Sequence, residues 1–407
     1  MRLLFLHQNF PGQFLHLAPR LARDGHEVVA LSARKEDVAL PGVRIIRYEV
    51  AETSAAGTLP MLRRFERARD YGASAAAAAL RLRGQGFSPD VIVTHPGWGE
   101  ALFLRDIWPG ARQLHYCEFH LHPFDPVQLF DPSAPLPLGQ LFESRINSGL
   151  NLYALDSMDR GYSPTEWQRQ QFPAAARELI SVVHDGINAG LCRPNRDAVL
   201  TLPNGRRLVY GDKVVTYVAR NLEPLRGFPE FMRGMARLLA RHGDVEVVVI
   251  GGDEVSYGRA HPSGRHWREV VLDEVDIDRS RVHFLGRVPY DQYLASLQIS
   301  AAHVYLTVPF VLSWSALEAM AAGCLLIASN TEPVREVVTD GENGLLVDFF
   351  DREGLAERVA ECLRQPEKFE PLRVAARETI LAKYTLARCL PVQIELVQSV
   401  ARARRAA

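Results

Sequence analysis

Cysteine is scarce in this chain of 407 residues and is not arranged in pairs. The cysteines stand at five scattered positions, Cys117, Cys192, Cys324, Cys362 and Cys389. Their odd number and the lack of a C-x-x-C motif argue against a disulfide framework and against a cysteine-based zinc site. We therefore expect a protein of a reducing compartment without a structural metal.

Neither sign of charge is in excess, and long apolar runs are absent. The chain has 47 Lys and Arg against 48 Asp and Glu, a formal net charge of −1, so no global field attracts nucleic acid. No apolar stretch approaches the about 20 residues that span a bilayer. Polar residues interrupt the start, MRLLFLHQNF, too early for a signal peptide. We expect a cytoplasmic protein that does not bind nucleic acid.

The dinucleotide-binding fingerprint is missing as well. The first strand-like segment, 2–6, is followed by HQNFPG and not by G-x-G-x-x-G. The glycine pair in IGGDE, 250–254, does not fit that fingerprint either. A nicotinamide-dependent oxidoreductase, which uses the same kind of sheet, is therefore the less favoured alternative.

The sequence does contain a regular alternation of strand-like and helical segments. In the first half we expect strands at 2–6, 27–32, 43–48, 90–94 and 112–117 and helices at 13–24 and 61–83. In the second half we expect strands at 214–219, 245–250, 282–285, 304–306 and 324–328 and helices at 228–241, 290–297, 315–322 and 352–364. This alternation predicts an α/β fold with parallel, doubly wound sheets. The length favours two Rossmann-like domains that face each other across a cleft and bind ligands at the carboxyl ends of their strands.

Turn signals mark the boundary between the two domains. Asp185-Gly186 and Asn204-Gly205 flank two prolines in this stretch. We therefore place an N-terminal domain at 1–190, a C-terminal domain at 191–385, and a last helix with a basic tail at 386–407.

The segment PFVLSWSALEAMAAG, 309–323, carries one carboxylate, Glu318, near the start of an expected helix. One interpretation is a capping box, in which Ser315 caps the helix and Glu318 reaches back to its backbone N–H. The other is ligand binding, because a helix N-terminus presents N–H groups to a phosphate. A carboxylate one turn further on would then accept hydrogen bonds from a neighbouring sugar diol.

Three further loops follow strands of the second half. Arg220 and Arg226 lie in YVARNLEPLRGF, where two guanidinium groups suit either a diphosphate or simple solvation. Gly252 in IGGDE permits either close backbone approach to a ligand or a tight turn. In FLGRVP, the backbone amides at Gly286 and Arg287 could read the edge of a nucleobase.

Together these segments resemble family 4 of the GT-B glycosyltransferases, the retaining class that uses nucleotide sugars. VHDGIN at 183–188 is similar to the family's domain-junction turn, and Arg220 with Arg226-Gly227 matches its phosphate-binding pair. LEAMAAGCLLIASNTEPVREVVTDGENGLLV, 317–347, matches its longest signature. The resemblance covers nearly the whole chain. It implies an N-terminal acceptor domain, a C-terminal donor domain and a last helix that crosses back onto the N-terminal domain.

The resemblance also implies roles for single residues. Glu318 would hold the ribose hydroxyls of the donor, and Arg220 and Arg226 would stabilise the charge that grows on the leaving diphosphate. Gly252 and Arg287 complete the expected donor side. The backbone amides that would hold the diphosphate are those of Ser313, Trp314 and Ser315.

One position departs from the family pattern. The family carries a paired glutamate eight residues before Glu318, which normally touches the donor sugar, and Phe310 stands there in this chain. The departure leaves a catalytically silent, nucleotide-sugar-binding protein as an alternative. Activity is compatible with Phe310, since retaining transfer by front-face attack lets the leaving phosphate take the proton of the acceptor.

The first half of the chain offers fewer matches. Gly12 in HQNFPG lies where the family places a glycine loop near the donor phosphates, and a plain turn explains it equally well. An exposed tip with His95 and Trp98, in THPGWGEAL, suits acceptor contacts. In LHYCEFHLHP, either Glu118 or His120 fills the position of a family residue that faces the transferred sugar.

Two features of the first half allow alternative interpretations, one as a metal site and one as a membrane contact. His115, Glu118, His120 and His122 offer an alternative metal site, but fixed zinc spacing is absent and the family generally needs no metal. The Arg-rich helix at 61–83 presents either a solvated face or a surface for peripheral contact with an anionic membrane.

The sequence therefore predicts a retaining, hexosyl-type glycosyltransferase. It would move a sugar from a nucleoside diphosphate to an acceptor hydroxyl of a polysaccharide, a lipid-linked or a small-molecule glycoconjugate. The nucleotide sugar is a co-substrate, and no further cofactor is expected. The expected location is the cytoplasm, including the inner face of the membrane.

Overall fold

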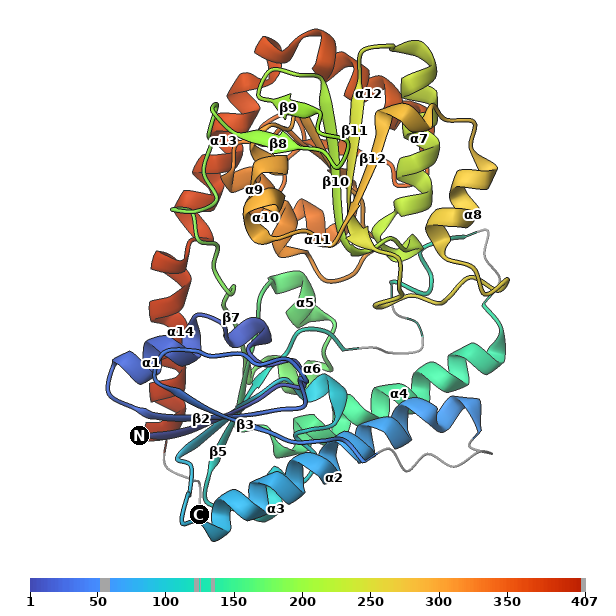
Figure 1. Cartoon of the computed structure of the whole chain (residues 1–407). Coiled ribbons are helices and arrows are strands. Elements are labelled where there is room, and N and C mark those ends of the chain that lie inside the picture. The colour runs from blue at the N-terminus through green and yellow to red at the C-terminus, as the bar shows by residue number, and fades with distance from the viewer. Residues whose placement is uncertain (52–58, 121–123, 125, 133–135, 404–407) are drawn as a thin grey trace. The chain divides into compact units, whose positions relative to one another are not determined.

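The computed structural model describes residues 1–51, 59–120, 124, 126–132 and 136–403. The chain divides into two compact units (Figure 1). Unit 1 consists of Met1–Asp185 and Ala387–Ala407, and unit 2 consists of Gly186–Leu386. Among the described residues, no helix combines the length and the apolar character needed to cross a membrane.

Unit 1 is built on a seven-stranded parallel sheet with the order β3-β2-β1-β4-β5-β6-β7. Its strands are β1 (Arg2–Leu6), β2 (Glu27–Ser32), β3 (Val43–Arg47), β4 (Val91–Thr94), β5 (Arg112–Tyr116), β6 (Arg160–Ser163) and β7 (Ile180–Val182). Its helices are α1 (Leu17–Arg23), α2 (Arg63–Gly84), α3 (Leu104–Ile107), α4 (Leu138–Ser157), α5 (Glu166–Gln170), α6 (Ala174–Arg177) and, from its second residue on, α14 (Leu386–Arg402). Short 3-10 turns are η1 (Gly12–Phe14), η2 (Pro60–Leu62) and η3 (Pro96–Trp98).

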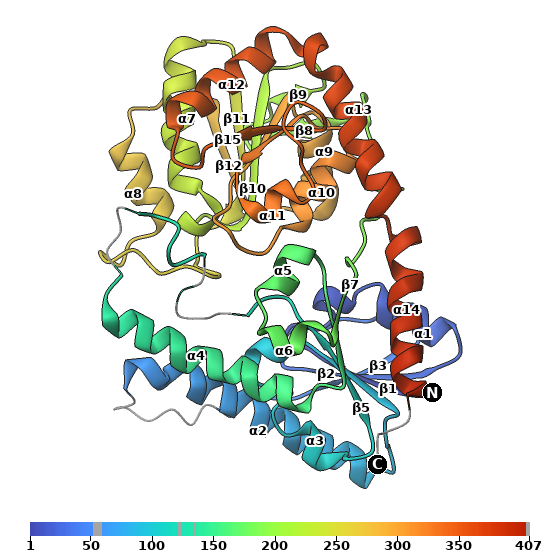
Figure 2. The same ribbon diagram turned by 180° about the vertical axis from the view of Figure 1, so that it is seen from behind.

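Both faces of this sheet are covered, because successive side chains of a strand point to opposite sides. On β1, Leu3 and Phe5 belong to the apolar cluster that includes residues of α1 and α14. Leu4 and Leu6 of the same strand belong to the cluster that includes residues of α2 and α3. Figure 2 shows α14 beside α1 on the face opposite to α2. Two buried faces explain why the central strands β1, β2 and β4 are nearly continuous apolar runs in the sequence.

Unit 2 repeats this architecture with a six-stranded parallel sheet in the order β12-β11-β10-β13-β14-β15. Its strands are β10 (Val214–Asn221), β11 (Glu246–Gly252), β12 (Val282–Gly286), β13 (Ala302–Tyr305), β14 (Leu326–Ser329) and β15 (Leu345–Val347). Its helices are α7 (Phe228–Arg241), α8 (Trp267–Glu274), α9 (Tyr290–Gln298), α10 (Trp314–Ala321), α11 (Glu332–Arg335), α12 (Arg352–Arg364) and α13 (Pro366–Lys383), with the 3-10 turns η4 (Pro224–Arg226) and η5 (Arg279–Arg281). A separate antiparallel hairpin consists of β8 (Val199–Thr201) and β9 (Arg207–Val209).

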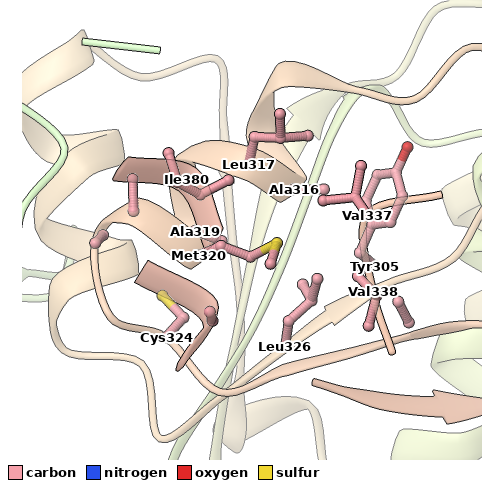
Figure 3. Packing of buried hydrophobic residues seen from close by; sticks show 14 of the residues in the cluster. Tyr305, Ala316, Leu317, Ala319, Met320, Cys324, Leu326, Val337, Val338 and Ile380 are labelled. Carbon is pink, nitrogen blue, oxygen red and sulfur yellow. The ribbon is translucent and has the colours of Figure 1, made fainter. Parts of the chain in front are cut away.

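Helix α10 is fixed to the sheet by an apolar cluster (Figure 3). Leu317 and Met320 of the helix are fully buried there, together with Leu326 of β14 and Ile380 of α13. This packing sets the rotation of the helix. Glu318, next to Leu317 in the sequence, is only partly buried and lies at the border of the cluster.

The predicted α/β class with two parallel sheets is confirmed. The helices expected at 228–241 and 352–364 coincide with α7 and α12. The helix expected at 13–24 is wrong in its first half, because the chain makes the turn η1 before α1 begins at Leu17. Pro19 lies in the first turn of α1, where its missing N–H costs nothing. The β8–β9 hairpin lies in the stretch whose turn signals predict the domain boundary.

Candidate functional site

Each sheet has one point where the order of the strands reverses. It lies between β1 and β4 in unit 1 and between β10 and β13 in unit 2. The crevice outside the carboxyl ends of such strands is the usual ligand site of an open parallel sheet. In unit 2 a guanidinium group occupies this place, and in unit 1 two imidazole rings do.

Arg226, at the reversal point of unit 2, is a buried cation that has no carboxylate partner among the described residues. It is 8% exposed. Its Nη1 donates to the Tyr305 hydroxyl at 3.1 Å, to Thr307 Oγ1 at 2.9 Å and to the Val311 carbonyl at 2.8 Å. Its Nε and Nη2 make no hydrogen bond or ion pair with the described part of the chain. Because burial of an unpaired charge is costly, this arrangement is typical of a site that takes an anion.

Gly227 holds Arg226 in this place. Its φ of +67° suits a residue without a side chain. A Cβ there would lie 2.4 Å from the Cβ of Leu306, just after β13. The chain therefore turns from η4 directly into α7 and brings Arg226 against the end of β13.

The start of α10 is joined to the same network. The Tyr305 hydroxyl that accepts from Arg226 also accepts from the Ser313 backbone N–H at 2.8 Å. Ser313 caps the helix, and its Oγ accepts from the N–H of Ser315 at 3.3 Å. Ser315 is therefore not the cap, and the capping-box interpretation of Ser315 and Glu318 is wrong. The predicted diphosphate contacts of the Ser313 and Ser315 amides require that these internal bonds are exchanged for the ligand, whereas Trp314 is exposed beside them.

Glu318 is instead held by side chains from outside its helix. Its Oε1 accepts from the Tyr290 hydroxyl at 3.0 Å and, more weakly, from the Cys192 thiol at 3.8 Å. Its Oε2 accepts from the Tyr293 hydroxyl at 2.5 Å. Burial raises the pKa of Glu318, and these three donors oppose that rise. The carboxylate is thus a positioned acceptor at the edge of the sheet.

The other predicted donor-side residues lie at the ends of neighbouring strands. A Cβ on Gly252 would lie 2.5 Å from Asn221 Oδ1 and 2.9 Å from Arg287 Nε, so glycine allows these strand ends to approach. Arg287 donates to Asn221 at 3.1 Å and pairs with Glu254 on the surface. Arg220 is exposed and makes no hydrogen bond or ion pair with residues that the structure describes. The predicted pair of arginines therefore divides into a buried member and a solvated one.

Glu223 is a site residue that the sequence did not reveal. It is fully buried, and its carboxylate accepts from the backbone N–H groups of Tyr257 at 3.2 Å and of Gly258 at 2.8 Å. These bonds fasten the loop after β11 to the end of β10. The Tyr257 ring consequently lies 5.2 Å from the ring of Phe310, and both rings lie within 6 Å of the Arg226 guanidinium carbon. A glutamate in a polar loop carries no local signal for this role.

At the reversal point of unit 1, the rings of His7 and His95 meet edge to face at 5.4 Å between centroids. His95 Nδ1 accepts from the N–H of Gly97 at 3.3 Å, which assigns the proton to Nε2. That nitrogen donates to Glu118 Oε2 at 3.2 Å, and Gln13 donates to Oε1 of the same carboxylate at 2.8 Å. His95 is buried, so the expectation of an exposed tip is wrong for this residue.

Glu100 brings a second carboxylate to the His95 cluster, and the sequence did not single it out. It is 1% exposed, and neither oxygen has a hydrogen bond of normal geometry within the described residues, although the N–H groups of Gln8 and of Glu100 itself lie near it. Burial raises the pKa of Glu100 to about 7. At Glu118 burial acts in the same direction, but the hydrogen bonds from His95 and Gln13 outweigh it and lower the pKa.

The remaining predicted residues of unit 1 are distributed around this cluster. Gly12 has a φ of +48°, and a Cβ there would lie 2.9 Å from the ring of His7, so glycine is required by the turn itself. The Trp98 ring stacks on His95 at 6.3 Å. His120 is buried and packs against the ring of Phe172 at 5.6 Å.

The alternative metal site is not assembled by the residues that the structure describes. His115 is buried and bonds to the side chain of Gln113 at 3.1 Å. His122 lies outside the described residues. Among the described residues, no three His, Cys, Asp or Glu side chains are placed to hold one metal ion.

Models of known families match both halves of the chain. The model of the glycosyl transferase family 4 group matches residues 24–191, and that of the glycosyl transferases group 1 matches residues 212–365. The chain belongs to the GT-B glycosyltransferases of the family 4 type. Unit 1 contains nearly all of the first match, and unit 2 contains all of the second.

Curated relatives of this family 4-type chain align over part of their length. A phosphatidyl-myo-inositol mannosyltransferase of Mycolicibacterium smegmatis is 29% identical over 35% of this chain and 34% of its own. A D-inositol 3-phosphate glycosyltransferase of Corynebacterium glutamicum is 31% identical over 47% of this chain and 44% of its own. The chain thus spans less than half the length of these relatives.

Solved GT-B structures match nearly the whole chain. Sucrose-phosphate synthase from Thermosynechococcus elongatus has a TM-score of 0.75 at 19% identity and covers 98% of this chain and 99% of its own. Anabaena HepE, solved in complex with UDP-glucose, has a TM-score of 0.68 at 15% identity and covers 98% of this chain and 100% of its own. At such low identity the likeness shows the fold.

Proposed function

We propose that this chain is a retaining glycosyltransferase that takes a sugar from a nucleoside diphosphate and passes it to an acceptor hydroxyl. The observation that carries the proposal is the buried guanidinium of Arg226, which lacks a carboxylate partner in the part of the chain that the structure describes and is joined through Tyr305 to the start of α10. A cation and a helix N-terminus that converge on one place suit a diphosphate. The family assignment favours glycosyl transfer over the nicotinamide-dependent alternative.

The proposed chemistry uses Arg226 as an electrostatic group. The bond between the anomeric carbon and the phosphate oxygen breaks, the acceptor oxygen bonds to that carbon on the same face, and its proton passes to the leaving phosphate. Arg226, assisted by the solvated Arg220, stabilises the charge on that phosphate, an effect of several kcal/mol in comparable sites. Glu318 accepts hydrogen bonds from the ribose hydroxyls. The Anabaena HepE structure was solved with UDP-glucose, so UDP is the first nucleoside diphosphate to test.

The acceptor is proposed to meet unit 1. Glu118 is favoured over His120 as the residue that faces the transferred sugar, because Glu118 shares a cluster with His95, whereas His120 packs against Phe172. The names of two relatives contain inositol, which makes a polyol hydroxyl a reasonable acceptor class. For a lipid-linked acceptor, the proposed contact with an anionic membrane is the exposed Arg face of α2.

A catalytically silent protein that binds nucleotide sugars is the second candidate, and Phe310 is the observation in its favour. Its ring lies 5.4 Å from the Arg226 guanidinium carbon, where the family carries a carboxylate. Such a protein would bind the nucleotide without transferring or hydrolysing the donor.

A thermal-shift panel tests the donor site first. UDP, GDP, ADP, CMP and NAD are compared on the wild type and on Glu318→Ala, with each ligand at 100 times its Kd, where a bound ligand adds about 2.7 kcal/mol of stability. Stabilisation by one nucleoside diphosphate that is reduced in Glu318→Ala supports the proposal. If none of them stabilises the wild type, the proposed donor site is wrong.

Incubation with the matching UDP-, GDP- or ADP-sugar and inositol then separates the active enzyme from the silent binding protein, because a silent protein forms neither a glycoside nor free sugar.

A further inference from the structure

Two phenols stand at the carboxylate that is proposed to hold the ribose. Tyr290 and Tyr293 lie three residues apart near the start of α9 and thus on one face of that helix. One hydroxyl donates to each oxygen of Glu318, at 3.0 Å from Tyr290 and 2.5 Å from Tyr293. Each oxygen of a carboxylate offers two lone-pair directions. The phenols therefore leave one strong acceptor direction on each oxygen.

That remaining pattern is complementary to a vicinal diol. A cis-diol presents two donors on adjacent carbons, and a carboxylate whose two oxygens each keep one free direction accepts both. The Cys192 thiol, at 3.8 Å from Oε1, is a weak donor and occupies little of this capacity. The phenols also fix the plane of the carboxylate, since they hold its two ends from one neighbouring helix.

We infer that Tyr290 and Tyr293 are positioning residues that orient Glu318 for a ribose diol and so make the donor site select ribonucleotides over 2′-deoxyribonucleotides. The inference rests on the proposed function, because it concerns the same carboxylate. It adds a cause for selectivity that lies in α9 and not in the helix that carries Glu318.

The charge of Glu318 gives the inference a second readout. Burial raises the pKa of this carboxyl group, and the phenols and the thiol are the groups that oppose the rise. The other titratable groups against it are Cys192, whose pKa burial raises to about 11, and the two phenols, whose pKa values are raised as well. Glu318 is thus the one carboxyl group of this set. Loss of a phenol hydroxyl raises its pKa further, and a protonated carboxyl group no longer accepts on both oxygens.

The test is isothermal titration of UDP, GDP and ADP, each beside its 2′-deoxy form, between pH 5 and 8. The proteins are the wild type, Tyr293→Phe and Tyr290→Phe, with Tyr210→Phe as the matched control. Tyr210 lies in the same unit, and its ring contacts Arg196.

We expect the wild type to prefer the ribonucleotide about tenfold, the value of one hydrogen bond to a charged group. In Tyr293→Phe this preference falls to about twofold, and the loss of affinity on acidification begins about one pH unit higher. The nucleotide phosphate titrates alike in all four proteins, so it does not produce the difference.

Three outcomes separate the inference from the function on which it rests. The inference is supported if the phenol variants, but not Tyr210→Phe, show a smaller preference for the ribonucleotide and lose affinity at a higher pH than the wild type. Equal selectivity and equal pH dependence in all four proteins overturns it and leaves the donor site intact. If no nucleoside diphosphate binds the wild type, the proposed function fails and the inference fails with it.

Discussion

The reversal points of the two sheets have the same topology and opposite chemistry. In unit 2 the loop after β10 and the last residue of β13 with the loop that follows it bring together Arg226, Tyr305 and Thr307, and the charged group among them is a cation. In unit 1 the loops after β1, β4 and β5 bring together His7, His95 and Glu118. Strand order provides the crevice, and a few residues after each strand decide what charge it accepts. The same fold thereby places a buried cation at the reversal point of one unit and a histidine–carboxylate cluster at that of the other.

The two clusters also differ in how their buried charges are satisfied. Three oxygens of the chain saturate one nitrogen of Arg226 and hold the group in place. At Glu100 neither buried oxygen has a normal hydrogen bond among the described residues. Neutral oxygens hold the Arg226 cation in place although no carboxylate of the described residues neutralises it, whereas Glu100 lacks even such bonds and destabilises the fold whenever it ionises. This contrast predicts opposite responses to substitution.

The largest expected effect is a gain of stability in Glu100→Gln. Burial raises the pKa of Glu100 from 4.5 to about 7, so protonation favours the folded state. The stability from this group is fully present below its unfolded pKa and is lost as the pH rises through its folded pKa. Since Gln carries no charge, the variant should be about 3 kcal/mol more stable than the wild type at pH 8 and about equal to it at pH 4. Urea unfolding at both pH values measures this, and an equal difference at both would contradict a buried, ionising Glu100.

Replacement of Arg226 should have the next largest effect, this time on the donor site. In Arg226→Lys the charge stays, but an ammonium group cannot bond three fixed oxygens and still present a planar fork to phosphate. We expect nucleoside diphosphate affinity to fall about 100-fold. Arg220→Lys is the matched control and should lose no more than about threefold, because the side chain is exposed. Equal losses in the two variants, measured by isothermal titration, would show that the buried arginine has no special role.

The smallest effect is expected at Glu118 and has the opposite sign to that at Glu100. Hydrogen bonds from His95 and Gln13 outweigh burial and lower its pKa. Its contribution is therefore present above its unfolded pKa and is lost as the pH falls through its folded pKa. Glu118→Gln should be about 1 kcal/mol less stable than the wild type at pH 7 and about equal to it at pH 3. If Glu118→Gln were instead more stable than the wild type at pH 7, the folded state would disfavour the charged form of Glu118, as it does that of Glu100.

Several site residues could be predicted from the sequence because they belong to local motifs. Arg226 and Glu318 stand at fixed distances from a glycine turn and from a helix start, and both occupy such places in the structure. Glu223 and Tyr293 were not found. Glu223 binds N–H groups that lie 33 to 35 residues further along the chain, and Tyr293 meets Glu318 across 25 residues. A pattern of neighbouring residues contains no record of such a pairing.

The sequence by itself determined the two parallel sheets, because apolar runs that alternate with helical segments bury themselves in only a few ways. It also determined the strand-end loops that carry the polar residues. Only the tertiary structure decided which of those residues became buried, paired or left without a partner. The bonds of Arg226 join positions 79 to 85 residues apart, and the link from His95 to Glu118 crosses 23. The physical reason is that the burial and pairing of a charge depend on groups that meet only when the strands assemble.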